Sequence, residues 1–586
     1  MLSIHKIKRE NGYVALFLAL IFCLFQYGIM RIFGFSLFPD EFGYWAPAAK
    51  ALGWDWSDTT SLGSYYSFGY SLLLAPILYF VKDSIAAYRV AVGLNVVLMA
   101  AGLVLLCRIL EKLFVGTAKS RLVLIGGIAA LYPVWIFYTQ LTMTEALLLF
   151  LYVLVCYLFL CFLEKPGMAA GGSLAAALAY MYFVHMRSIG TVLAVCIALF
   201  LLVVWKRDKR YGKWMAVSLV VLCLFFVLGG GLKEALISGL YQGSSGVQYN
   251  DYSGQWGKLA YLFSLRGLWD FLLGLVGKIL YLSLATYGLG IWGVWYIVKR
   301  VWRVFRQGRT DGEKTDFFWV FLLLSLLGQM MVTCIYTIGS NEADINRVDL
   351  FVHGRYNDML MPMLMAVGIW AMGNSRKIVQ GTGLAMGCQA LCSWIVWAEV
   401  VRTGIDDIDG FLMVGMCYTF RNGTFQPDTF FLRAWLLGTG LTVLFAGCIW
   451  IVQRFKEAEM LLLFLAFLQV GLAVLAGEHY IYWGNAFAYG DIQVADKLLE
   501  VLEDAEEDTR VVHFYDKEEL QYIELVQFRL RDKRVEILTR EEQGRLEGIV
   551  KDGTILITQD TYAYNEELKK IYRKYWQSGH LVLFYE

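Results

Sequence analysis

The sequence predicts a polytopic α-helical membrane protein with a small α/β domain at its C-terminal end. Of the 586 residues, 58% are hydrophobic and 17% are charged, whereas soluble domains average about 45–50% and about 25%. Charge is unevenly placed, because residues 487–586 hold 36 of the 101 Lys, Arg, Asp and Glu side chains. We therefore expect a transmembrane body over 1–486 and a soluble domain over 487–586.

Composition and cysteine spacing argue against nucleic acid and zinc as partners. The 14 basic and 22 acidic residues of the C-terminal segment give −8, which leaves +9 for the body out of a net charge of +1. Neither part carries the dense basic face that phosphate-backbone binding needs, so nucleic acid is not an expected partner. The eleven cysteines lie almost all in apolar runs, without CxxC or a spacing typical of zinc sites.

Thirteen apolar runs approach the length, about 20 residues, that crosses a bilayer as a helix. The first run follows a basic start and lacks a small-residue cleavage site, so we expect a retained span and not a signal peptide. The runs cover 13–33, 85–107, 122–140, 146–163, 168–185, 189–205, 214–231, 276–298, 317–338, 358–374, 378–398, 431–452 and 460–477.

The distribution of Lys and Arg orients these spans. With the N-terminus in the cytoplasm, the inner segments hold 23 basic residues, more than the longer outer loops hold, as the positive-inside rule requires. An odd number of spans then places the C-terminal domain outside the cell. The long loops 34–84, 232–275, 339–357 and 399–430 also lie outside, which indicates that function is located at the outer face.

The first outer loop contains a shorter apolar segment, 68–81. At about 14 residues it is too short to cross a bilayer comfortably. Its aromatic residues, together with Gly69 and Pro76, favour a helix that lies along the membrane surface.

The C-terminal segment alternates between helix-like and strand-like patterns, which predicts a mainly parallel sheet. Its glycines form no GxGxxG, so nucleotide binding has no support. A lid, a module that docks the acceptor or a partner, and a structural cap all remain open. We expect helices over 491–504, 516–530, 540–549 and 563–576 and strands over 510–514, 534–538, 553–557 and 580–585.

Two adjacent carboxylates, Asp40 and Glu41, follow the first span and lie next to aromatic residues. Shielding from water raises the pKa of a carboxylate and makes it a usable base near neutral pH. The alternative is a solvated turn of the loop.

Two arginines are expected on the same outer face. Arg187 lies at the turn after the fifth span, and Arg355 precedes the tenth span with His353 and Tyr356 beside it. A guanidinium holds a phosphate through two parallel hydrogen bonds, and His353 and Tyr356 add further donors. The alternative is that both arginines only anchor the chain in the headgroup region.

Glu145 opens the fourth span on this face. It is either a site residue or the partner of Thr142 in a capping box at the start of a helix. The charged loop 341–349 is expected to be mostly solvated surface.

Carboxylates and arginines on one membrane face suggest transfer of a group from a lipid phosphate. The chain contains no GxSxG, HExxH or Walker A motif that would indicate other chemistry. Nucleotide-activated sugars are not available outside the membrane, so a lipid-linked donor is the expected substrate. A polysaccharide polymerase or ligase, a flippase or other transporter of lipid-linked sugars, and a binding protein remain alternatives.

These motifs together resemble the GT-C glycosyltransferases, the polytopic enzymes that use polyprenyl-phosphate-linked sugars. Among them, the sequence most resembles the bacterial protein mannosyltransferase-like, aminoarabinose transferase-like and RgtA/B/C/D-like proteins, over roughly residues 10–375. The matching residues are Pro39-Asp40-Glu41, Tyr66-Ser67-Phe68-Gly69-Tyr70 with Pro76, Thr144-Glu145, Arg187, and Gly354-Arg355-Tyr356 with Pro362.

The resemblance implies an inverting sugar transfer at the outer face of the cell membrane, with Asp40 as base and Glu41 orienting the acceptor or a cation. Arg355 and Arg187 would stabilise the departing lipid phosphate, and Glu145 would orient an arginine or the acceptor. A divalent cation, if one takes part, would be held by Asp40 and Glu41, although no second Asp stands in DxD spacing. The expected partners are the bilayer, a polyprenyl-phosphate sugar and a lipid, glycan or protein acceptor.

Overall fold

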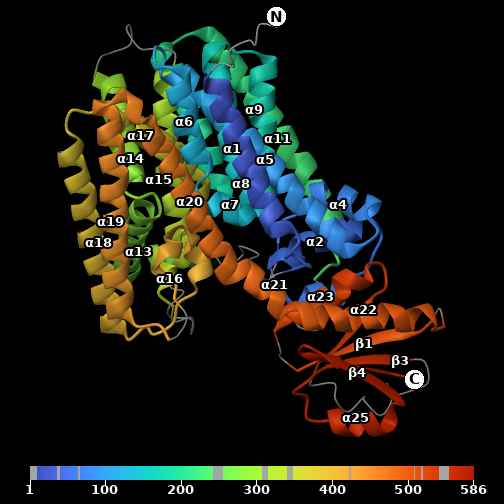
Figure 1. The fold of residues 1–586 in the computed structure, drawn as a ribbon. Helices are drawn as coiled ribbons and strands as arrows, with labels where there is room; N and C mark the ends of the chain where they lie inside the picture. Colours follow the sequence, from blue (N-terminus) through green and yellow to red (C-terminus); the bar gives the residue numbers. More distant parts are fainter. Residues whose placement is uncertain are drawn as a thin grey trace, which may run out of the picture.

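The computed structural model shows a bundle of long helices with a small sheet domain at one end (Figure 1). It describes residues 9–35, 38, 40–63, 66–241, 255–306, 315–338, 347–421, 424–506, 508–516, 519–539 and 554–586. Pro39, the loop residues 341–346 and the expected helix 540–549 lie outside this part of the chain.

Long apolar helices make up the body, and the protein is a multi-pass membrane protein. In the described residues, ten helices are long and apolar enough to cross a membrane, or eleven if a pair bent by 60° counts as one span. The body helices are α1 (Arg9–Ile29), α5 (Ser84–Leu113), α6 (Lys119–Ala130), α7 (Pro133–Thr139), α8 (Thr144–Glu164), α9 (Met168–Val184), α10 (Ile189–Lys206), α11 (Lys209–Ile237), α13 (Leu265–Ala285), α14 (Leu289–Arg306), α15 (Asp316–Thr337), α17 (Met361–Gly373), α18 (Ile378–Thr403), α19 (Pro427–Arg454) and α20 (Met460–Ala476).

The expected span 276–298 is broken into α13 and α14. The break contains Tyr287 (φ 55°) and Gly288 (φ 76°), both in the left-handed region that ends helices. A Cβ on Gly288 would stand 2.7 Å from Thr442 Cγ2, so only glycine fits there. Two other expected spans form α9 and α17, which have 17 and 13 residues. The count of thirteen spans therefore stays a prediction.

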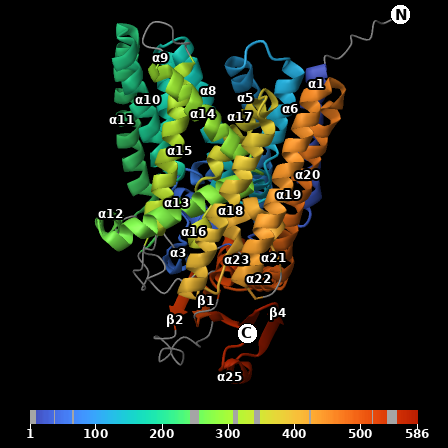
Figure 2. The same cartoon turned by 90° about the vertical axis from the view of Figure 1, so that its left-hand side faces the viewer.

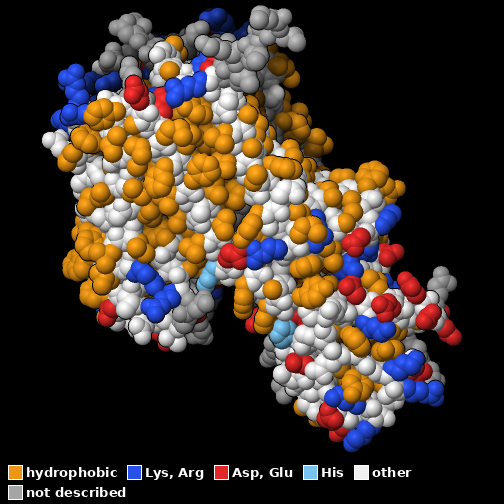
Figure 3. Space-filling model, viewed as in Figure 1, with side chains coloured by type: hydrophobic (Ala, Val, Ile, Leu, Met, Phe, Trp, Pro, Cys, Tyr) orange, Lys and Arg blue, Asp and Glu red, His pale blue; other side chains and the backbone are white. Residues whose placement is uncertain are grey.

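The two ends of the bundle differ in what they carry. Figures 1 and 2 show the N-terminal end of the chain on one side and the sheet domain on the other. The short helices α2 (Asp40–Ala51), α3 (Ser57–Leu62), α4 (Ser71–Phe80) and α16 (Asp349–Val352) lie at the end with the sheet domain. Figure 3 shows hydrophobic side chains covering the middle of the bundle, with Lys and Arg gathered at the N-terminal end. The side of the membrane on which each end lies stays a prediction.

The expected surface helix in the first outer loop is present as α4. Leu72, Tyr79 and Phe80 on it are 39%, 57% and 76% exposed. Exposed apolar side chains on a short helix suit a position against lipid.

The C-terminal sheet has five strands in the order β2-β1-β3-β5-β4. The strands β1 (Arg510–Tyr515), β2 (Val535–Thr539) and β3 (Thr554–Gln559) are parallel, and β5 (Leu581–Tyr585) runs antiparallel to β3 and to β4 (Lys574–Ser578). Helices α22 (Tyr489–Glu503) and α23 (Leu520–Leu530) share a core with one face, and α25 (Asn565–Ile571) with the other. The sheet is therefore mixed, with a parallel half and an antiparallel half.

The expected helix 563–576 is wrong in its second half. Helix α25 ends at Ile571, and residues 574–578 pair with β5 as an edge strand. Strand pairing outweighs the local helical pattern here, because Tyr575 and Trp576 suit a pleated surface.

The body passes into the domain without a loose linker. Helix α20 runs into the π-helical turn η6 (Gly477–Tyr482), then α21 (Trp483–Phe487), then α22. Helix α23 then lies back against the first outer loop, where the Ser84 Oγ donates to the Phe528 carbonyl at 2.9 Å. The sheet domain thus reaches the end of the bundle where the predicted site residues lie.

Candidate active site

All seven predicted site residues lie at the end of the bundle that faces the sheet domain. Asp40 and Glu41 begin α2, Glu145 lies in the first turn of α8, and Arg187 lies in the short helix η1 (Met186–Ser188). The remaining three, His353, Arg355 and Tyr356, lie between α16 and the short helix η3 (Asp358–Leu360). Segments far apart in the sequence thus meet at one place.

Four of these residues form a chain of alternating charge. Arg355 Nη1 lies 2.7 Å from Asp40 Oδ2, and its Nε lies 2.6 Å from Glu145 Oε1. Arg187 Nη2 bonds the same Glu145 oxygen. Glu145 and Arg187 are each 2% exposed, and Arg355 is 8% exposed. Buried charges require partners of this kind, and here two carboxylates balance two guanidinium groups.

Local backbone structure explains why these charges sit where they do. Asp40 and Glu145 both lie in the first turn of a helix, where the helix dipole stabilises negative charge. The segment that carries Arg355 is fixed by its own backbone, since the amides of Gly354 and Arg355 both donate to the Leu412 carbonyl. A Cβ on Gly354 would fall 1.9 Å from the Tyr281 ring, so glycine allows this close approach.

Asp40 is the reachable carboxylate of the chain. Its side chain is 25% exposed. Oδ1 accepts a hydrogen bond from the Tyr66 hydroxyl at 2.7 Å, which leaves the carboxylate held between Tyr66 and Arg355. The Arg355 guanidinium also lies 5.1 Å from the centre of the Phe411 ring, on which Phe38 stacks. A reactive group needs this combination of access and fixed orientation.

Glu41 has a different environment from its neighbour. It is 0% exposed, and its Oε2 accepts from the Thr142 amide and hydroxyl, both at 2.8 Å, and from the Tyr88 hydroxyl. Trp45 Nε1 donates to the same Thr142 hydroxyl at 3.0 Å. Glu41 thus ties α2 to α5 and to the turn before α8.

These bonds overturn the capping-box alternative for Glu145. Thr142 is engaged by Glu41, and the N-cap position of α8 is Met143, which makes no side-chain cap. Glu145 points its carboxylate to the two arginines instead.

Asp40 and Glu41 do not fit a shared cation site. Asp40 is occupied by Arg355 and Tyr66, whereas the buried Glu41 is occupied by Thr142 and Tyr88. Within the described ranges, no group of three or more His, Cys, Asp or Glu side chains is arranged to hold a metal ion.

The second arginine rests on an aromatic pair. The Arg187 guanidinium lies 4.3 Å from the centre of the Tyr356 ring, and the His353 ring lies 4.4 Å from the same ring. Burial, with the nearby positive charges of Lys278 and Arg355, lowers the pKa of His353 well below its usual value. His353 is therefore a neutral imidazole, so the arginines are the cations of the site.

Two donors of Arg187 have no partner among the described residues. Its Nε and Nη1 are buried without a hydrogen bond, as is Nδ1 of His353. Buried unpaired donors are uncommon in native proteins, and at a guanidinium they indicate an anionic ligand.

Sequence reasoning missed several residues that support the site. Asp358 is 1% exposed and accepts from the Tyr132 and Tyr281 hydroxyls at 2.8 and 2.7 Å. Lys278 is 1% exposed and donates to the carbonyls of Leu350 and Phe351 at 2.7 and 3.0 Å, which braces the segment before Arg355. A lone lysine inside an apolar run was the available signal, because such a charge requires a partner.

The expectation of a solvated loop is wrong for Asp349. Its side chain is 0% exposed. Its Oδ2 lies 3.3 Å from Arg347 Nη2, and its Oδ1 accepts a hydrogen bond from the Asp409 amide at 2.6 Å. Burial raises the pKa of Asp349 to about 6, an effect that the Arg347 charge opposes.

Comparison with known proteins supports the fold. No family model and no curated protein sequence matches the chain. The structure of ArnT, an aminoarabinose transferase, from Cupriavidus metallidurans bound to undecaprenyl phosphate matches with a TM-score of 0.54 and 13% identity, over 98% of both chains. The apo form of that protein matches with a TM-score of 0.50 and 14% identity, again over 98% of both chains.

An oligosaccharyltransferase from Archaeoglobus fulgidus in its apo form also matches, with a TM-score of 0.45 and 11% identity, over 91% of this chain and 65% of that one. The match to ArnT confirms, at the level of the fold, the resemblance that the sequence motifs indicate. The chain shares the fold of ArnT along nearly its whole length.

Proposed function

We propose that the protein is a membrane glycosyltransferase that moves a sugar from a polyprenyl-phosphate donor to an acceptor hydroxyl at the outer membrane face. The observation that carries this proposal is the chain of Asp40, Arg355, Glu145 and Arg187 at one end of the bundle. It combines a reachable carboxylate with two guanidinium groups. A sugar transfer in which a lipid phosphate is the leaving group needs a base and positive charge of this kind.

In the proposed step, Asp40 takes the proton of the acceptor hydroxyl while the oxygen of that hydroxyl attacks the anomeric carbon of the donor sugar. The new bond forms between the acceptor oxygen and that carbon. The bond from the anomeric carbon to the phosphate oxygen breaks, and its electron pair leaves with polyprenyl phosphate. A single displacement of this kind inverts the anomeric configuration.

Arg355 links the two halves of the step. In the structure, Arg355 Nη1 bonds Asp40 Oδ2. A donor phosphate competes for the same guanidinium, so donor binding draws Arg355 toward the phosphate and releases Asp40 to accept a proton. Tyr66 remains bonded to the other Asp40 oxygen and keeps its orientation.

Arg187 and Glu145 complete the donor side. The unpaired donors of Arg187 suit phosphate oxygens, and Glu145 holds the two arginines at a fixed separation. The bound undecaprenyl phosphate of the ArnT structure supports a polyprenyl phosphate as the donor carrier.

The test is transfer by purified full-length protein in lipid nanodiscs from a panel of undecaprenyl-phosphate sugars carrying radiolabel. We expect the native protein to release undecaprenyl phosphate from at least one donor, in the presence of cell-envelope extract, and Asp40→Asn to release none. Failure with every donor, by protein whose fold is intact, contradicts a transferase and favours a transporter.

Orientation is proposed together with the function. We infer that the sheet domain is extracytoplasmic and the N-terminus cytoplasmic, which is supported by the basic residues at the N-terminal end of the bundle. Protease added to spheroplasts should then digest the sheet domain, and full protection would reverse the orientation.

A further inference from the structure

A second cavity lies at the sheet-domain end of the bundle, and positively charged side chains line it. It has a volume of about 410 Å³ and lies between helix α19 and the turn η6. Arg421, Arg433 and His479 line it together with Thr424 and Thr429, whereas none of the seven predicted site residues does. Among the described residues that line the cavity there is no Asp or Glu. Its wall therefore carries positive charge without a carboxylate to balance it.

The irregular helix η4 (Gly410–Thr419) separates this cavity from the candidate active site. Gly410 and Met413 line the cavity. The ring of Phe411, which lies between them in the chain, is 5.1 Å from the Arg355 guanidinium and stacks on Phe38. A ligand in the cavity and a donor phosphate at Arg355 would therefore lie on different sides of this segment.

The two arginines of the cavity have no anionic partner among the described residues. Arg421 is exposed and Arg433 is half-buried, and neither forms an ion pair in this part of the chain. The Nε atom of Arg433 is buried there without a hydrogen bond. Arg347, at the same end of the bundle, does pair with Asp349. Because unpaired like charges repel each other and a buried donor requires an acceptor, this arrangement favours an anionic ligand.

The π-helical turn η6 keeps its own carboxylate away from the cavity. His479 and Tyr480 of this turn line the cavity. Glu478, which precedes them, faces α1, where its Oε2 accepts a hydrogen bond from Arg31 Nη2 at 2.7 Å. The turn therefore presents an imidazole and a phenol to the cavity and leaves its positive charge in place. Turns of this kind are rare and occur frequently at functional sites.

The start of α19 adds backbone donors to the same wall. Gln426 and Thr429 line the cavity, and the N-cap residue Gln426 makes no side-chain cap. The first amides of a helix lack partners within the helix, and the helix dipole favours an anion beside them. The acidic residue of this turn, Asp428, accepts from Trp397 Nε1 on α18 at 2.7 Å and does not line the cavity. Guanidinium groups and a helix start together suit a phosphate.

The surroundings of the cavity are those of a membrane surface. Trp397 and the exposed Trp483 lie at this end of the bundle, and tryptophan is enriched at the level of the lipid headgroups. Beside Arg433 on α19, Leu432 and Leu436 are 56% and 53% exposed. Figure 3 shows Lys and Arg side chains gathered at this end of the bundle next to a hydrophobic surface. A molecule with a phosphate head and apolar chains matches both features.

We propose that this cavity binds the phosphate group of an anionic lipid, with Arg421 and Arg433 as its ligands and the lipid chains on the apolar surface of α19. Inorganic phosphate offers the same oxygens but has no chains to cover Leu432 and Leu436. The site is distinct from the proposed donor site. A binding measurement tests it, so the sugar transfer can fail while this inference holds, and the reverse.

The experiment measures lipid binding to the full-length protein in detergent by native mass spectrometry. The native protein is compared with the double variant Arg421→Gln/Arg433→Gln. The Kd is measured for phosphatidylglycerol, which is anionic, and for phosphatidylcholine, which has the same phosphate but no net charge. Excess inorganic phosphate is added as a competitor, and the thermal unfolding midpoint of each protein is recorded.

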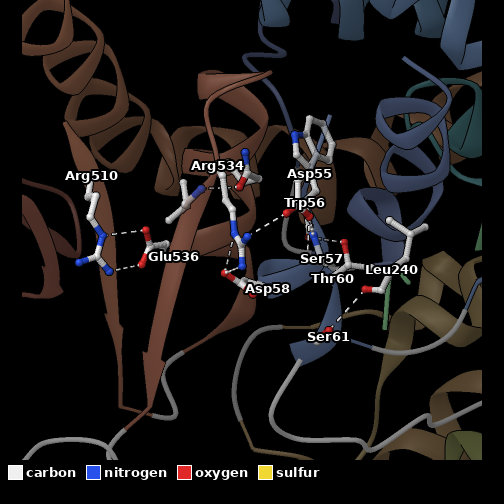
Figure 4. Close-up of polar contacts among 12 residues, drawn as sticks. Asp55, Trp56, Ser57, Asp58, Thr60, Ser61, Leu240, Arg510, Arg534 and Glu536 are labelled. Atoms are coloured by element: carbon white, nitrogen blue, oxygen red, sulfur yellow. Dashed lines mark hydrogen bonds and ion pairs between the residues drawn. The ribbon is translucent and has the colours of Figure 1, made fainter. Parts of the chain in front are cut away.

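A second double variant, Arg510→Gln/Arg534→Gln, is the matched control. It removes the same two positive charges, but from arginines that already have carboxylate partners. Figure 4 shows Arg510 paired with Glu536, and Arg534 paired with Asp55 and Asp58. Any loss of binding that follows from net charge alone will therefore appear in both double variants.

We expect the native protein to bind phosphatidylglycerol about tenfold more tightly than phosphatidylcholine, the effect of one hydrogen bond to a charged group. The cavity variant should lose this preference and keep its unfolding midpoint, whereas the control variant should bind as the native protein does. If the double variant does not fold, Arg421→Gln alone, at an exposed position, is tested in the same way.

Three results would overturn the inference. The first is phosphatidylglycerol binding by the cavity variant at the native Kd. The second is an equal loss of binding in both double variants, which would show a general effect of charge. The third is full displacement of phosphatidylglycerol by inorganic phosphate, which would assign the cavity to the free anion and not to a lipid.

Discussion

Arginines meet carboxylates in two regions of this protein, and the two regions differ in solvent exposure. In the candidate active site, Arg355 and Arg187 are 8% and 2% exposed and bond Asp40 and Glu145. Between the sheet domain and the first outer loop, the side chain of Arg534 is 48% exposed, and those of its partners Asp55 and Asp58 are 51% and 22% exposed. The bond lengths are similar, so distance alone does not separate a site from a surface contact.

The difference shows which ion pairs carry function. An exposed pair is screened by water and typically contributes about 0–1 kcal/mol. A buried pair loses hydration when it forms, and removal of one partner typically costs about 3–5 kcal/mol. The buried chain in the candidate active site is therefore the costlier one to break, whereas the exposed contacts contribute little to stability.

The largest effect is expected for the reachable carboxylate of the buried chain. Asp40→Asn keeps the shape of the side chain and removes the proton acceptor, so turnover should fall about 1,000-fold, within the range of general-base contributions. Steady-state release of undecaprenyl phosphate measures this. Asp58→Asn in the surface contact is the matched control, and equal losses in both variants would erase the distinction between the two regions.

Next in size is the expected effect of Arg355. Arg355→Ala removes a donor to the phosphate and leaves Asp40 and Glu145 without their shared partner, so turnover should fall about 100-fold. Arg355→Lys retains the charge but loses the planar fork, and should recover part of the loss. Donor KM and kcat are measured for both variants, and identical values for Ala and Lys would argue against a phosphate clamp.

Glu145 tests whether the chain orients its arginines. Glu145→Gln gives the site a net positive charge, so the donor KM should stay level or fall while kcat falls about tenfold because the arginines are misplaced. Steady-state kinetics separates the two parameters. A raised donor KM with an unchanged kcat would instead make Glu145 a direct substrate ligand.

The smallest effect is expected for the surface contact. Arg534→Ala should lower the free energy of unfolding by less than about 1 kcal/mol and leave turnover within twofold of native. Chemical unfolding of the detergent-solubilised protein and the transfer assay report the two values. A loss of activity comparable with Arg355→Ala would mean that the exposed region contributes directly to catalysis.

The sequence was sufficient to predict the bundle and the charged members of the site. Apolar runs identify membrane helices, and charges at span ends are informative because few charges occur in such a chain. Asp40, Glu145, Arg187 and Arg355 could each be named for this reason, and the structure brings them into contact.

The remaining parts depend on contacts between distant segments. Phe411 becomes a site residue only through packing with Arg355, and nothing local marks it. Tyr66 stands in one of the matching motifs, but its bond to Asp40 is seen only in the structure. The break at Gly288 lies within a run long enough to be predicted as one span, and Gly288 approaches Thr442 closely in the structure. Helix α23 is buried over nearly all of its residues, so the face that meets the body is defined only by the docking of the domain.

The docking of the C-terminal domain sets an order for the making of this protein. The bond from Trp56 to Arg531 joins residues separated by 475 positions, and the bond from Ser84 to Phe528 joins residues separated by 444. A nascent chain therefore forms its body helices before the C-terminal domain can pack on the first outer loop. Partly synthesised protein would already hold Asp40, Glu145 and the two arginines while the first outer loop still lacks its cover, so this end of the bundle is completed only when nearly all of the chain has been made.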